Sequence, residues 1–248
     1  GAVTPDGELC WIDPTFNATT LLYVNPATGT YRRVSFQHVA GSTGSTTVLP
    51  GDFVFYPDGT LFGYITFTGG ALSRIWIDPT QPAPTARTIE PVDSTLALAT
   101  TGSNTSVDLV RIGNNVYAIA KNTSTKKWCL LVTDSAHTTV VTAIDNVPTQ
   151  ATTVRLVYTL HGELLLVGDK STNKVRLLLV NPTDYSQRIV DLPYTGTATG
   201  FTGVLRYGHG FLVTDSKTTL YQFNFDYPQI TIGATLVATP NGSGGARW

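Results

Sequence analysis

The chain of 248 residues is 42% hydrophobic and 13% charged, and its formal net charge is −1. This composition is typical of a globular chain and excludes extended disorder. The near-zero charge argues against nucleic-acid binding, which needs a basic excess, and the sequence holds no run of about 18 apolar residues that would insert into a membrane.

A unit of four short strands recurs along the sequence and is clearest between residues 53 and 90. An apolar strand leads into Asp58-Gly59, a pair that favours a tight hairpin turn. The third strand stops at Asp78-Pro79, because proline has no N–H to donate to a neighbouring strand. The four strands are expected at about 52–57, 61–67, 73–77 and 86–89.

Two landmarks of this unit repeat in register. The first turn recurs at Asp6-Gly7, Asp58-Gly59, Gly113-Asn114, His161-Gly162 and His209-Gly210, in steps of 52, 55, 48 and 48 residues. The third strand ends at Pro26, Pro79, Asp134, Pro182 and Asp226. No segment has convincing helical periodicity, so the five copies predict radial repetition of a four-stranded unit.

The sequence therefore predicts an all-β fold, a five-bladed β-propeller of four-stranded antiparallel blades that forms a single domain over residues 1–248. The blades are expected at about 1–37, 52–92, 107–145, 154–192 and 203–238. Their inner strands are expected at about 2–5, 52–57, 107–112, 154–160 and 203–207. Residues 239–248 are expected either to close the ring beside residues 1–3 or to form a frayed tail.

Several hairpins resemble those of known propeller families. The run LYVNPATG at 22–29, with IWIDP at 75–79 and LVNP at 179–182, resembles the LYxVDPxTG hairpin of many propellers, including the quinoprotein-like and lactonase-like families. DGTLFG at 58–63 resembles their DGxLYG turn. The resemblance covers the blade skeleton over nearly the whole chain, implies an architecture and assigns no catalytic residue.

The expected connections between blades, at 37–51, 91–106, 146–154 and 192–203, are rich in Thr, Ser and Gly. In a propeller such crossovers gather on one face, where their hydroxyls are able to bind a polar ligand. Simple polar crossovers without a ligand are the alternative. The ligand-binding residues predicted on this face are Thr43, Ser45, Asp52, Thr101, Asn104, Asp108, Thr152, Arg155, Thr197 and Thr199.

Glycosidase chemistry would need two carboxylates across the central channel. Glu8 and Glu163 follow first turns, and Glu90 ends an outer strand. Asp52 and Asp108 begin inner strands, so they are the acidic residues expected nearest the channel mouth. No catalytic residue is assigned from these positions.

The remaining chemistry-bearing residues have structural interpretations. His38, His137, His161 and His209 are expected as surface turn residues, and Cys10 and Cys129 as buried free thiols. Eight aromatic residues are expected in the packing between blades: Trp11, Tyr23, Phe55, Tyr64, Trp76, Tyr117, Trp128 and Tyr221. His and Cys spacings indicate no metal site, and no nucleotide-binding motif occurs, so no cofactor is expected.

Two functions follow from these patterns. The first is a non-enzymatic binding module, displayed on a virion or secreted as a lectin-like binder, whose partner is a glycan, a protein receptor or a neighbouring virion protein. The alternative is a glycan-processing enzyme with its site in the central channel. An extracellular or virion-surface location is expected with the first function.

Overall fold

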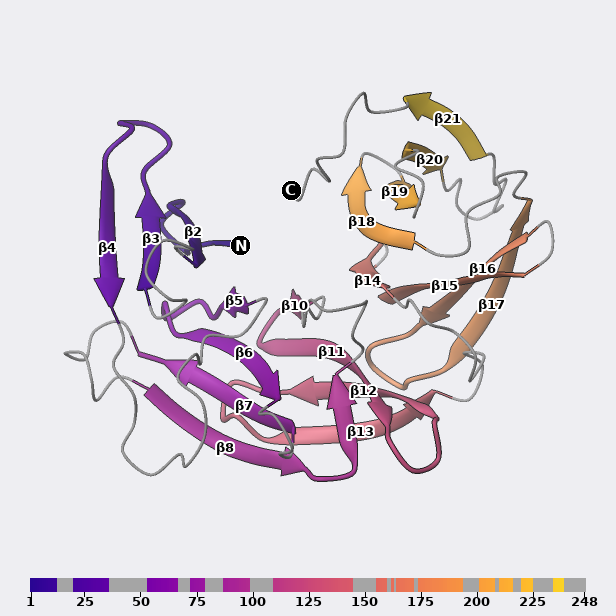
Figure 1. Ribbon diagram of the computed structural model, residues 1–248, viewed down its shortest axis with the longest axis horizontal. Coiled ribbons are helices and arrows are strands. Elements are labelled where there is room, and N and C mark those ends of the chain that lie inside the picture. The colour runs from indigo at the N-terminus through magenta and orange to yellow at the C-terminus, as the bar shows by residue number, and fades with distance from the viewer. Residues whose placement is uncertain are drawn as a thin grey trace. The chain divides into compact units, whose positions relative to one another are not determined.

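The computed structural model describes residues 1–12, 20–35, 53–66, 72–78, 87–98, 109–144, 155–159, 162, 164–171, 174–193, 201–207, 210–215, 220–224 and 234–238. Every regular element in these ranges is a β-strand (Figure 1). The helix search over the same ranges finds none long and apolar enough to cross a membrane.

Consecutive strands form antiparallel sheets of four, each with its strands in chain order. The first sheet contains β1 (Ala2–Val3), β2 (Leu9–Ile12), β3 (Thr20–Val24) and β4 (Tyr31–Ser35). The second contains β5 (Phe53–Phe55), β6 (Leu61–Thr66), β7 (Leu72–Ile77) and β8 (Arg87–Asp93). The predicted four-stranded meander is therefore confirmed in both.

The later sheets repeat this order. The third contains β10 (Val110–Ile112), β11 (Asn115–Asn122), β12 (Trp128–Thr133) and β13 (Thr139–Ile144). The fourth contains β14 (Arg155–Tyr158), β15 (Leu164–Ser171), β16 (Lys174–Val180) and β17 (Gln187–Pro193). The fifth contains β18 (Phe201–Tyr207), β19 (Gly210–Asp215), β20 (Leu220–Asn224) and β21 (Ala234–Ala238).

The chain divides into two compact units. One comprises Gly1–Thr125 and Leu131–Val141, and the other comprises Lys126–Leu130 and Thr142–Trp248. In the second unit, β14 and β15 lie against β18, and the β16 residues Leu177–Val180 are all buried. The assignment of the whole chain to one domain stays a prediction.

The predicted first turns are confirmed where the structure describes them. The N–H of Gly7 donates to the carbonyl of Thr4 at 3.0 Å, and that of Gly59 to Tyr56 at 2.9 Å. Both glycines have left-handed backbone, with φ of 89° and 88°. Glycine adopts this conformation at no steric cost, which explains the Asp-Gly pair at each turn.

The third-to-fourth-strand hairpins of the first and fourth sheets share one geometry. Gly29 closes the first by donating to Asn25 O at 2.9 Å, and Tyr185 donates to Asn181 O at the same distance in the fourth sheet. Gly29 and Tyr185 have φ of 71° and 59°. Both hairpins begin with Asn-Pro, and in both the fifth residue is left-handed, even where that residue is tyrosine.

One face of the second sheet packs on the first sheet. Phe53, Phe55, Leu61, Ile75 and Ile77 form a buried cluster with residues of the first sheet, namely Cys10, Leu21 and Tyr23. The rings of Tyr23 and Phe55 lie 6.4 Å apart at 50°. This face holds the core predicted between neighbouring sheets.

The aromatic core prediction is confirmed for five of the eight residues: Tyr23, Phe55, Tyr64, Tyr117 and Trp128 are buried. Trp11 is 37% exposed on the outer face of the first sheet and Trp76 is only partly buried, so neither belongs to the described core and their packing between blades stays a prediction. The side chain of Tyr221 lies outside the described residues. Both predicted free thiols, Cys10 and Cys129, are confirmed as buried and unbridged.

The other face of the second sheet packs on the β12–β13 hairpin. The hydroxyl of Tyr56 donates to Asp134 O at 2.9 Å, and Tyr64 shares a hydrogen bond with Thr133. His137 has φ of 61° and stacks on Trp76, with ring centroids 4.2 Å apart at 24°. The prediction of His137 as a surface turn residue is therefore half right, because its backbone turns but its ring packs between the sheets.

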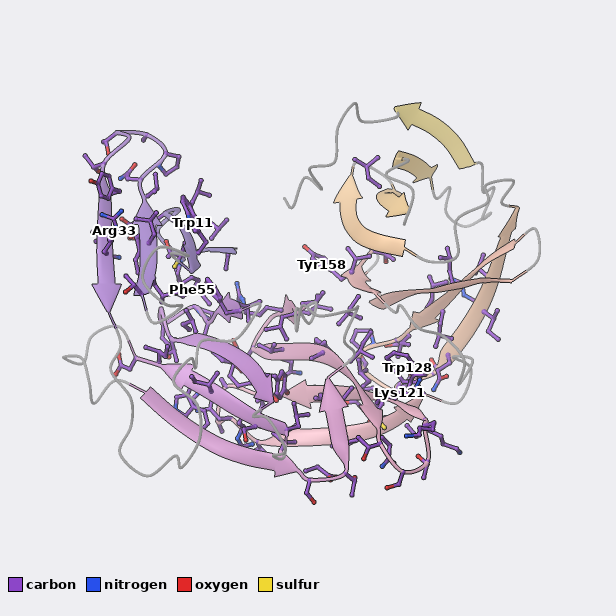
Figure 2. The ribbon with its side chains drawn as sticks, in the orientation of Figure 1. Trp11, Arg33, Phe55, Lys121, Trp128 and Tyr158 are labelled. Carbon is purple, nitrogen blue, oxygen red and sulfur yellow. The ribbon has the colours of Figure 1, made fainter. Side chains whose placement is uncertain are left out.

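The outer face of the first sheet is exposed and apolar. Register places Val3, Leu9 and Tyr31 in one row across the sheet, and Trp11 in the next row on the same face. Their exposed fractions are 59%, 41%, 65% and 37% in that order. Figure 2 shows Trp11 on β2 and Arg33 on β4 of this sheet.

The expected crossover 91–106 is not a simple loop. β8 continues to Asp93, and after a two-residue turn β9 (Leu96–Leu98) pairs antiparallel with the end of β11. The prediction of a polar loop along the whole of this segment is therefore wrong. The apolar Leu-Ala-Leu run inside the polar composition is what forms the strand.

Candidate functional site

The predicted ligand residues fall almost wholly outside the described residues. Those lying there are Thr43, Ser45, Asp52, Thr101, Asn104, Asp108, Thr152, Thr197 and Thr199. Arg155 begins β14 and its backbone pairs with Val167, while its side chain is not described. Their gathering on one face stays a prediction.

One polar cluster on the crossover end of the sheets is described, and we call it the Thr95 cluster: Asp93, Thr95, Asn122, Thr123 and Ser124. It joins the β8–β9 turn to the β11–β12 hairpin. The N–H and Oγ1 of Thr95 both donate to Asp93 Oδ1 at 2.7 Å. The N–H of Thr123 donates to Thr95 O at 2.8 Å, so the two turns are fastened together.

Asn122 completes the Thr95 cluster. Its Nδ2 donates to Thr95 Oγ1 at 3.2 Å, and its Oδ1 accepts the N–H of Ser124 at 3.0 Å and of Thr125 at 2.8 Å. Asp and Asn fold back on the chain in this way because their short side chains cap nearby N–H groups. These hydrogen bonds hold the two turns of the cluster together.

The surface of the cluster offers exposed hydroxyl groups. Ser94, Thr95, Thr123 and Ser124 are all exposed. Hydroxyls both donate and accept hydrogen bonds, so such a surface suits a polar, hydroxylated ligand. The sequence pointed to this end of the sheets but not to these residues; the Asp-Ser-Thr turn at 93–95 was the available signal.

Of the acidic residues weighed for catalysis, the structure describes the Glu8 side chain. Its Oε2 accepts a hydrogen bond from Arg32 Nη2 at 2.7 Å, and the Arg32 guanidinium lies 3.9 Å from the Tyr23 ring centroid. The hydrogen bond with Glu8 raises the pKa of Arg32. Glu8 therefore fastens the first turn to β4, a structural role.

The buried ionisable groups favour their neutral forms. Burial raises the pKa of the Cys10 thiol to about 12 and that of the Tyr64 hydroxyl to about 12. It also raises the pKa of Tyr23 and of Tyr56. These groups stay protonated at neutral pH, so none of the four is an activated nucleophile or base.

In the part of the chain that the structure describes, no three His, Cys, Asp or Glu side chains come together in a group that could hold a metal ion. The described carboxylates Asp93 and Glu8 are each engaged with a protein donor. The exposed groups of the Thr95 cluster are hydroxyls that donate and accept hydrogen bonds.

Sequence comparisons leave the family open, since no family model matches the chain and no curated protein matches it. Solved structures do resemble it. A candidate 6-phosphogluconolactonase of Bacteroides fragilis matches with a TM-score of 0.56 and 13% identity, over 95% of this chain and 67% of that one. At this identity the likeness shows the fold alone.

Two further structures are similar at lower TM-scores. BamB of Moraxella catarrhalis has a TM-score of 0.43 and 14% identity, over 95% of this chain and 75% of that one. A prolyl endopeptidase has a TM-score of 0.49 and 15% identity, over 97% of this chain, which spans about a third (35%) of its length. The chain thus has an all-β, β-propeller-like fold of four-stranded antiparallel sheets.

Proposed function

We propose that the chain is a non-enzymatic binding module that recognises a polar, hydroxylated ligand such as a glycan at the crossover end of its sheets. The Thr95 cluster carries this proposal, since it presents exposed hydroxyls on a hydrogen-bonded frame. A preformed polar surface loses little entropy on binding, which favours recognition.

Display outside the cell or on a virion belongs to the same proposal, with a glycan, a protein receptor or a neighbouring virion protein as the partner. Near-neutral charge and a hydroxyl-rich surface suit attachment to glycans. The fold supports this only as a rigid scaffold, because one β-propeller-like architecture serves many functions.

We further propose that the scaffold is a five-bladed propeller closed into a ring. The outer face of the first sheet supports closure, since Val3, Leu9 and Tyr31 are exposed there in one apolar row. In a closed propeller each blade has neighbours on both faces, so no such row is left in water.

Binding is tested with the full chain on a printed array of neutral, sialylated and sulfated oligosaccharides. Ser94→Ala with Ser124→Ala removes two exposed hydroxyls whose side chains make none of the cluster's hydrogen bonds described above. We expect binding to weaken at least tenfold and the fold to persist.

Ser135→Ala is the matched control, because Ser135 is an exposed serine on the β12–β13 hairpin at the opposite end of the sheet. The control should bind as the parent does. Equal loss of binding in both variants, no binding to any oligosaccharide, or hydrolysis of a bound oligosaccharide would contradict the proposal.

A further inference from the structure

β9 and β10 both pair with β11 along the same edge. β10 pairs Ile112 with Asn115 and Val110 with Tyr117. β9 pairs Leu98 with Ala120, and its pairing runs on to the end of β11. Since β12 occupies the other edge of β11, β9 and β10 must follow one another along the inner edge.

The two strands also run in the same direction, because both are antiparallel to β11. Between their paired positions on β11, only Ala118 and Ile119 intervene. A continuous inner strand would need two residues there, but eleven lie between Leu98 and Val110. The segment between Leu98 and Val110 is therefore nine residues longer than a continuous strand requires.

The repeat spacing is also longest at this unit. The step from Asp58 to Gly113, which spans this segment, is 55 residues, whereas the next two steps are 48. The extra length thus falls in the unit where β9 lies. Ser94 and Thr95 already connect β8 of the second sheet to β9 of the third. The extra residues come after this connection, between β9 and β10.

β9 is firmly anchored despite its three residues. Leu96 is 3% exposed. Thr95 before it bonds to Asp93, Asn122 and Thr123. The buried Leu96 side chain and the hydrogen bonds of Thr95 thus hold β9 against β11 as part of the third sheet.

We infer that β9 and β10 are two halves of one inner strand, interrupted by a nine-residue insertion that the fold does not need. Residues 100–108 are that insertion. Removing them brings Ala99 and Leu109 opposite Ile119 and Ala118 in unbroken register. The insertion includes Thr101 and Asn104, two of the predicted ligand-binding residues. The sheet should therefore fold without these two residues. Only their role as ligand-binding residues rests on the proposed function.

The test deletes residues 100–108 from the full chain and measures thermal unfolding by circular dichroism. The melting temperature should stay the same or rise by a few degrees, since fewer residues between two paired segments cost less entropy to fix. Deleting residues 101–108 is the matched control. It leaves one residue too many, which forces a bulge or a register slip that turns side chains to the wrong face, so it should melt several degrees lower.

Equal melting temperatures for the two deletions, or a nine-residue deletion that fails to fold, would overturn the inference. Amide hydrogen exchange on the parent chain provides the second measurement. Residues 96–98 and 120–122 should be protected within tenfold of residues 110–117. Exchange of residues 96–98 at the rate of an open loop would also overturn it. Neither measurement involves a ligand, so failure here is distinct from failure of the binding proposal.

Discussion

Single residues in this chain carry backbone conformations that their neighbours impose. Tyr185 has φ of 59° at the hairpin position that Gly29 occupies in the first sheet. The left-handed region costs a residue with a side chain about 1–2 kcal/mol. The surrounding turn, which begins with Asn181-Pro182, imposes the conformation, so the sequence predicted the turn but not the left-handed tyrosine.

Tyr185→Gly should therefore stabilise the chain by up to about 1 kcal/mol, the relief of strain less the larger entropy of glycine in the unfolded chain. Urea denaturation monitored by circular dichroism measures the change. Thr183→Gly in the same hairpin is the control and should destabilise. A loss of stability in Tyr185→Gly would show that its ring contacts outweigh the strain.

The Tyr64 hydroxyl makes stability depend on alkaline pH. Its pKa is raised to about 12 in the folded chain, against about 10 when unfolded. Its contribution is complete below pH 10 and is lost as pH rises through 12, because the unfolded state loses the proton first. Cys10 acts in the same direction from a lower pH, since burial raises its pKa to about 12 from 9.0.

Tyr64→Phe should cost about 1 kcal/mol at pH 7 through the lost hydrogen bond to Thr133. Between pH 10 and 12 its stability should fall less steeply than that of the parent, by up to about 1.4 kcal/mol per pH unit. Denaturant titrations at a series of pH values measure both effects. Parallel pH curves for the two proteins would rule out this role of Tyr64.

At the scale of elements, contacts between sheets depend on which face each strand presents. Register places Phe62 opposite Trp76 and Tyr64 opposite Arg74, so one face of the second sheet meets the β12–β13 hairpin. Alternation in the sequence predicted these faces well. The place of His137 was not predictable, because its stacking depends on where a hairpin of another sheet ends.

His137→Asn should keep the left-handed backbone, which asparagine tolerates, and lose the stacking on Trp76. We expect a cost of about 1 kcal/mol, the value of an aromatic pair beyond its area. A double-mutant cycle with Trp76→Leu isolates the pair. A coupling energy below about 0.3 kcal/mol would mean that the rings are neighbours without interaction.

The four-stranded meander of the third sheet was predicted from the sequence, but its additional strand β9 was not. Turn pairs and strand stops identified the strands of the meander, because Gly, Pro and Asx act locally. β9 has no such landmark, and its partner lies more than twenty residues further along the chain. Only the longer 55-residue step indicated that the unit contains an insertion.

At the scale of the molecule, we propose that the five repeated sheets form one closed propeller. The hydrogen-bonded meanders and the likeness to a solved structure at a TM-score of 0.56 support the propeller-like class. Repetition was predictable from the sequence because each unit carries its own landmarks. The proposed ligand-binding residues were harder to choose from the sequence, because the crossovers share only their polar composition.

Small-angle X-ray scattering from the full chain tests the single closed ring most directly. A compact domain of this length has a radius of gyration of about 18 Å. We predict that value, with one maximum in the distribution of interatomic distances. A radius above about 21 Å, with a second maximum from two separated bodies, would contradict a single closed propeller.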